Sequence, residues 1–162
     1  MIQKPLVYLL PDGLGELELS PTVLTHFSAH RQTRHALEAG GQLFAEMGEK
    51  QQTRVIEVTG PRPTDRRSPF GYRPDRKMEK AEIADRYKRG LHFVGDWHTH
   101  RQINPTPSVT DKHTMLDLVN LSSYDLAGFI LVIVGLAAFP DGLHVSFHTK
   151  TSLITLTRIE RE

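Results

Sequence analysis

Two histidines, a serine and an aspartate are spaced so that they could together build a metal site. His98 and His100 stand two residues apart at the end of a predicted strand, so both imidazoles project from one face. Such positions lie ~7 Å apart at Cα, which lets two imidazoles converge on one ion. After an interval of seven residues comes Ser108, and Asp111 then falls in the first turn of a predicted helix. Two imidazoles and one carboxylate leave a fourth position for water, which is typical of catalytic zinc.

The same residues also have a purely structural interpretation. A His-x-His pair on a strand is commonly two surface residues, and Ser108 with Asp111 has the spacing of a helix capping box. The two interpretations are compatible, because Ser108 can begin the helix while its hydroxyl still faces the ion. The joint pattern, His-x-His followed by Ser-x-x-Asp, favours the metal site.

Composition narrows the chemistry that remains. The 162 residues include nine His and no Cys, which excludes disulfides, Cys-type zinc fingers, iron–sulfur clusters, thiol nucleophiles and the Cys-built zinc site of deaminases. A net charge of +1 argues against a protein that binds nucleic acid. No apolar segment reaches the ~20 residues of a membrane helix, and no signal peptide is apparent. We therefore expect a soluble, cytoplasmic protein that does not bind membranes.

One mixed α/β domain over residues 1–162, with a mixed sheet flanked by about three helices, is predicted to position these side chains. The helices are expected from Pro21 to about Leu37, over Lys77–Arg89 and over Ser108–Leu121. The strands are expected at Leu6–Leu10, Leu14–Leu19, Gln42–Met47, Thr53–Thr59, Leu91–His98, Gly128–Leu136, Leu143–His148 and Ser152–Ile159.

Two segments carry predictions of their own. An apolar stripe of Met78, Ala81, Ala84 and Tyr87 is expected to bury one face of the second helix. Residues 60–76 contain four Pro and five Arg and show no core-forming period. A loop of that length in a compact domain is often functional, so we predict that it faces the substrate.

Residues near the predicted metal ligands have mainly structural interpretations. Trp97 alternates away from His98 along the strand and is expected in the core, whereas Asp96 could orient a ligand His. His144 and His148 share one face of a late strand and are interpreted as a surface pair.

The complete pattern resembles the signature of the JAMM (MPN-plus) zinc metalloproteases. Members of that family also use a glutamate in an upstream Glu-x-x-Gly context, which Glu38-Ala39-Gly40-Gly41 matches here. The resemblance implies the single-domain, cytidine-deaminase-like JAMM/MPN fold, with one catalytic Zn²⁺ held by His98, His100 and Asp111. It further implies that Glu38 acts as general base and that Ser108 donates a hydrogen bond to the oxyanion.

Within the family, the chain is most similar to compact bacterial members, which include the deconjugating peptidases of anti-phage cyclic-oligonucleotide (CBASS-type) operons. The Arg- and Pro-rich segment 60–75 and the run from Asp96 to His100 carry this likeness. It implies an isopeptidase that acts at the C-terminus of a ubiquitin-like or similarly conjugated protein. Arg101 stands where many members have Pro, a difference that leaves the predicted ligands intact.

Two alternatives stay open at this point. One is a processing peptidase that trims a β-grasp carrier protein at an ordinary peptide bond. The other is a non-catalytic MPN scaffold that binds a partner, although such scaffolds typically lack the ligands that are all present here.

Overall fold

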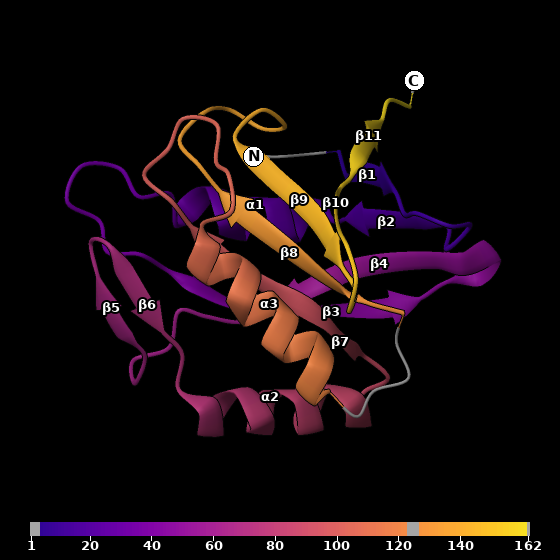
Figure 1. Ribbon diagram of the computed structural model, residues 1–162, viewed down its shortest axis with the longest axis horizontal. Coiled ribbons are helices and arrows are strands. Elements are labelled where there is room, and N and C mark those ends of the chain that lie inside the picture. The colour runs from indigo at the N-terminus through magenta and orange to yellow at the C-terminus, as the bar shows by residue number, and fades with distance from the viewer. Residues whose placement is uncertain (1–3, 123–126, 162) are drawn as a thin grey trace.

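The computed structural model describes residues 4–122 and 127–161, and a twisted mixed sheet dominates it (Figure 1). The helices of these residues are α1 (Pro21–Ala29), α2 (Arg76–Lys88), α3 (Val109–Leu121) and the short 3₁₀ helix η1 (Glu49–Gln51). The strands are β1 (Leu6–Leu9), β2 (Glu16–Leu19), β3 (Gly40–Met47), β4 (Gln52–Val58), β5 (Arg66–Ser68), β6 (Gly71–Arg73), β7 (His92–Thr99), β8 (Phe129–Val134), β9 (Leu143–His148), β10 (Leu153–Thr155) and β11 (Thr157–Ile159). The predicted mixed α/β class with three helices is confirmed. None of the described helices is long and apolar enough to span a bilayer.

The main sheet has nine strands in the order β10-β9-β8-β7-β3-β4-β2-β1-β11. Neighbours pair antiparallel except β7 with β8 and β2 with β4, which are parallel. Only Leu156 separates β10 from β11, although these strands lie at opposite ends of the order. The sheet must therefore curl until its two edges approach each other. The single strand predicted over Ser152–Ile159 is wrong for this reason, because the chain changes edges at Leu156.

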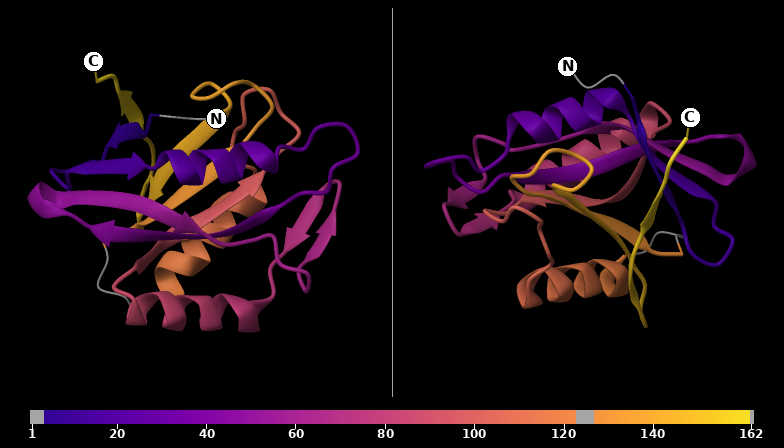
Figure 2. Two further views of the ribbon diagram at one scale, coloured as in Figure 1. Left: turned by 180° about the vertical axis from the view of Figure 1, so that it is seen from behind. Right: turned by 90° about the horizontal axis from the view of Figure 1, so that it is seen from above.

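Apolar cores cover both faces of the sheet. α1 packs Phe27 into one core, where Trp97 is buried as predicted. α3 places Met115 and Val119 in the other core, and Figure 2 shows these two helices on opposite sides of the sheet. Because side chains alternate along a strand, β7 directs Trp97 toward α1 and His98 toward the side of α3.

α1 ends at Ala29, well before the predicted end near Leu37. After Phe27 the sequence offers no large apolar residue until Leu37, so further turns would have no core to pack against. Gln32 instead turns inward and is 2% exposed, with its amide accepting from Thr99 and donating to the Pro69 carbonyl. Tertiary hydrogen bonds thus replace helix continuation, and the chain runs on toward the sheet.

The apolar stripe predicted for α2 is also wrong. The exposed residues of this helix include Met78, Ala81, Ala84 and Tyr87. Glu79 and Glu82 are buried in their place, and Glu82 forms a 2.6 Å ion pair with Arg62, which is 5% exposed. A buried ion pair is costly to break, so this pair helps to orient α2, whose Ile83 also packs against the core.

Residues 60–76 were predicted as a loop but contain the hairpin of β5 and β6. Its support is polar, since the Tyr72 hydroxyl donates to Asp65 and accepts from Arg62. A hairpin held by buried hydrogen bonds needs no apolar periodicity, which is why the sequence pattern did not reveal it.

His144 and His148 are 9% and 4% exposed, so their interpretation as a surface pair is wrong. Both lie on β9, which pairs with the fully buried β8. The His148 Nε2 lies 2.7 Å from the Ser146 hydroxyl, and burial lowers the pKa of His148 from 6.5 to about 4. The folded protein therefore keeps this imidazole neutral where an unfolded chain would protonate it.

We expect the free energy of unfolding to fall as the pH drops from about 6.5 to about 4, the window set by the lowered pKa of His148. Protonation of this one imidazole in the unfolded chain should lower the free energy of unfolding by about 2–3 kcal/mol near pH 4. Urea titrations at several pH values across the window measure the dependence of the free energy of unfolding on pH. His148→Gln should reduce the slope of this dependence. His35→Gln, at an exposed position, is the control; a His148→Gln variant with the wild-type slope would contradict the assignment.

Candidate metal centre

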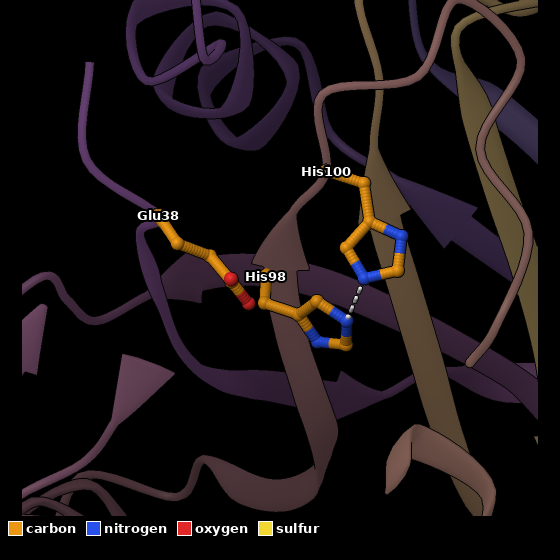
Figure 3. A group of neighbouring side chains, drawn as sticks. All are labelled: Glu38, His98 and His100. Atoms are coloured by element: carbon orange, nitrogen blue, oxygen red, sulfur yellow. Dashed lines mark hydrogen bonds between the residues drawn. The ribbon is translucent and has the colours of Figure 1, made fainter. Parts of the chain in front are cut away.

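His98, His100 and Asp111 converge where β7 ends and α3 begins. The His98 and His100 Nε2 atoms lie 3.1 and 3.2 Å from the two Asp111 carboxylate oxygens. The two Nε2 atoms are themselves 3.2 Å apart, and Figure 3 shows the rings facing each other. Tetrahedral zinc with bonds of about 2.0–2.1 Å places its ligand atoms about 3.3 Å apart. The three side chains therefore fit one such ion.

Glu38 adds a second carboxylate beside this centre. One of its oxygens and the ring nitrogens of His98 and His100 all lie within 4.8 Å of one another. Figure 3 shows the carboxylate directed toward His98. Burial raises the pKa of Glu38, although the two nearby imidazoles oppose this shift. A carboxylate with a raised pKa is better matched to proton transfer near neutral pH.

Glycines permit Glu38 to approach the ligands. Gly40 pairs with His98 across β3 and β7, and Gly41 pairs with Trp97. A Cβ at Gly40 would lie 2.7 Å from the Trp97 carbonyl oxygen, and one at Gly41 would collide with the carbonyl of Thr59. Both obstacles are backbone atoms, which cannot rotate away. The Glu-x-x-Gly pattern is thus a requirement of strand packing at the site.

Backbone hydrogen bonds hold Glu38 from both sides. Its N–H donates to the Ser68 carbonyl over 2.9 Å, and its carbonyl accepts from Arg67 Nε over 2.8 Å. The next residue, Ala39, donates to the hydroxyl of Thr99, the residue between His98 and His100 in the sequence. The hairpin and the ligand strand therefore fix Glu38 together. Sequence reasoning missed Arg67 and Thr99, because their contacts span long separations and follow no local spacing.

Ser108 and Asp111 form the expected capping box at the start of α3. The Asp111 N–H donates to Ser108 Oγ over 3.0 Å, and the Ser108 N–H donates to Asp111 Oδ2 over 2.8 Å. The same carboxylate faces both imidazoles, so the capping and ligand positions coexist. Burial alone would raise the pKa of Asp111, but hydrogen bonds from His100 and His98 hold it far below its usual range. The carboxylate is thus kept ionised, as a metal ligand must be.

A cavity of about 850 Å³ opens over the centre. Its lining includes Glu38, Ser108 and the three predicted ligands, together with residues of the β5–β6 hairpin. Asp96 also lines this cavity, where burial raises its pKa to about 7 and its Oδ1 has no hydrogen-bond partner. No hydrogen bond from Asp96 to a ligand His exists among the described residues, so the proposed orienting role finds no support.

Comparison with known proteins identifies the family. Residues 20–147 match the family described as prokaryotic homologs of the JAB domain. The chain belongs to this family. The JAB-family chain is also 33% identical, over 103 residues, to a protein described as "CD-NTase/cGAS isopeptidase" from Enterobacter hormaechei subsp. hoffmannii (strain UCI 50). The match covers 60% of this chain and 55% of that relative, so it spans only about half the relative's length.

Two solved structures share the overall fold of this chain. A solution structure from Desulfitobacterium hafniense superposes with a TM-score of 0.61 at 21% identity, covering 85% of this chain and 87% of the other. One from Salinibacter ruber (strain DSM 13855) gives 0.52 at 21% identity, with 88% of each chain covered. At this identity the likeness concerns the fold alone.

Metal binding should depend on the three converging side chains. We expect purified protein to retain about one divalent metal ion per chain and His98→Ala or Asp111→Asn to lose it, because each removes one of three protein ligands. Inductively coupled plasma mass spectrometry measures the content, and the shift of the unfolding temperature with added zinc measures binding. His113→Ala, at an exposed α3 position, is the matched control. Full metal content in His98→Ala would refute the site.

Proposed function

We propose that this protein is a zinc-dependent isopeptidase. It would hydrolyse the bond that joins the C-terminus of a ubiquitin-like or similarly conjugated protein to a target amine. The main support is the position of the Glu38 carboxylate beside the three converging side chains, in a cavity that the hairpin also lines. The Enterobacter relative is described as an isopeptidase, which supports this choice of bond. The resemblance of the sequence to the deconjugating peptidases of CBASS-type operons further suggests a role in regulating conjugation during anti-phage defence.

The chain's own residues account for the proton movements. Zinc held by His98, His100 and Asp111 would supply Lewis acidity and lower the pKa of a bound water. Glu38 accepts a proton from the attacking water and returns it to the departing amine. The position of Glu38 against both His ligands and its raised pKa suit these two transfers.

Ser108 is placed to stabilise the negative charge that develops on the substrate carbonyl oxygen. Its hydroxyl oxygen already accepts a hydrogen bond from the Asp111 N–H. Its own proton has no acceptor among residues 4–122 and 127–161, so it can be donated to the substrate. Side chains at a helix N-cap are well fixed, which makes this donor preorganised.

Glu38→Gln should slow hydrolysis strongly while leaving metal content intact, because the amide cannot accept the proton. We expect a loss of roughly 10²–10⁴ in kcat, the usual contribution of a general base. A fluorescence assay should offer a model isopeptide and a linear fusion side by side. Glu49→Gln, the same substitution at an exposed glutamate, is the control.

Each outcome of that assay is informative. Undiminished cleavage by Glu38→Gln would contradict the mechanism. Cleavage of the linear fusion alone would indicate a processing peptidase that trims a β-grasp carrier. Failure of the metal-loaded protein to cleave either bond would indicate a non-catalytic scaffold.

Arg67 should act as a positioning residue for Glu38. Arg67→Met removes the donor to the Glu38 carbonyl, and we expect kcat to fall roughly tenfold with KM and metal content little changed, because the base is misplaced. Arg67→Lys should recover part of the loss. Arg34→Met, at an exposed arginine without an ion pair among the described residues, is the control. A change confined to KM would contradict the role.

A further inference from the structure

Arg66 and Arg73 face each other directly across the β5–β6 hairpin. Both are exposed, and both line the cavity that contains the candidate metal centre. Like charges directly opposite each other in an antiparallel pair destabilise it. Neither arginine side chain has an ion pair or a hydrogen bond within the described part of the chain. The hairpin therefore holds two uncompensated positive charges at a cost to its own stability.

Acidic residues near the hairpin are already engaged elsewhere. None occurs between Asp65 and Asp75 in the sequence. Asp65 has a fully buried carboxylate that accepts from Tyr72 and from the Asp75 N–H. Asp75 caps α2 by accepting from the N–H groups of its first turn. Neither carboxylate is available to neutralise the arginine pair.

Arginines on other surfaces of the protein are commonly neutralised. Arg54 pairs with Glu18, and Arg86 and Arg89 both pair with Glu57. With a net charge of only +1, the chain has nearly as many carboxylates as cations. The lack of a partner at the hairpin is thus a local feature of the cavity wall, not a consequence of a basic composition.

Charge is unevenly distributed along the cavity. Glu38 and Asp111 belong to the candidate metal centre, where a bound cation would neutralise them, and Glu79 pairs with Arg76. Arg66 and Arg73 line the same cavity from the hairpin. We infer that Arg66 and Arg73 bind acidic side chains in the substrate segment that leads to the scissile bond. This inference rests on the proposed function, because the same cavity must admit that segment if the bond is to reach Glu38.

The chemistry of arginine suits this partner. A guanidinium binds a carboxylate through two parallel hydrogen bonds, and two guanidiniums opposite each other can share one carboxylate or bind two. The anionic side chain would remove the repulsion between the arginines, so part of its binding energy comes from relieving it. A neutral or basic substrate segment would gain neither effect.

Binding of product-like peptides tests the inference without requiring hydrolysis. Fluorescein-labelled peptides of equal length, each with a free C-terminal glycine, would carry Glu, Gln or Lys at internal positions. We expect zinc-loaded protein to bind the Glu peptide about tenfold more tightly than the Gln peptide, as two modest ion pairs allow, and the Lys peptide most weakly. The preference should weaken as ionic strength rises. Fluorescence anisotropy measures the affinities.

Variants assign the preference to the two arginines. The double variant Arg66→Gln/Arg73→Gln should lose the preference for the Glu peptide. The double variant Arg66→Glu/Arg73→Glu should instead prefer the Lys peptide. The control is Lys88→Gln with Lys150→Gln, which removes the same charge from exposed positions outside this cavity. The urea midpoint of the double Gln variant should equal or exceed that of wild type, since a repulsion is lost.

Several results would overturn the inference. Equal affinities for the Glu, Gln and Lys peptides would do so, as would a Glu preference that survives in the double Gln variant. An adenine dinucleotide that binds through both arginines, while no peptide does, would reassign the pair to nucleotides. Cleavage of conjugates without any charge preference would refute this inference alone. A Glu preference in a protein that cleaves no conjugate would refute the proposed function alone.

Discussion

A Cβ atom at Gly40 would lie 2.7 Å from the carbonyl oxygen of Trp97, so β3 approaches β7 more closely there than a larger residue would permit. The site depends on this approach. Gly40 is paired with His98, and the chain immediately before it carries Glu38 to the predicted metal ligands His98 and His100. A side chain at Gly40 would push β3 away from the backbone of β7, and one at Gly41 would collide with the carbonyl of Thr59. Main-chain packing therefore sets the distance between Glu38 and the two imidazoles.

Hydrogen bonds carried by the hairpin complete this arrangement. Glu38 is tied through its backbone to Ser68 and Arg67, and Gln32 links Thr99 to the hairpin turn at Pro69. The hairpin itself rests on the buried Arg62, which also orients α2. Polar contacts thus connect the wall of the cavity to the candidate base. A group that binds to the hairpin would act on the same element that holds Glu38.

Asp111 shows how one carboxylate serves two structural demands. It accepts the N–H of Ser108 as part of the capping box and contacts both imidazoles with its two oxygens. The cap fixes where α3 begins, and that start fixes where the carboxylate lies. Local helix chemistry and site geometry are consequently the same constraint, and the ordinary capping interpretation does not compete with the functional one.

Local sequence patterns determined those features of the fold that depend on neighbouring residues. Ser20-Pro21 and the Ser108–Asp111 box mark helix starts, alternation placed Trp97 in the core, and the spacing of His98 and His100 put two imidazoles on one face. These features depend on neighbours within a few residues. The sequence also carried the Glu-x-x-Gly pattern, although its physical basis, the close approach of the Thr59 carbonyl to Gly41, is visible only in the folded chain.

Tertiary structure alone decided where α1 ends, which face of α2 is buried, and that residues 66–73 form a hairpin. In each case a buried polar side chain prevailed over local propensity. Gln32 bonds to Thr99, and Arg62 bonds to Glu82 and Tyr72. Such partners lie far apart in the sequence and are recognised by no periodicity. Their hydrogen bonds become strong only once water is excluded, which is a property of the folded protein and not of any segment.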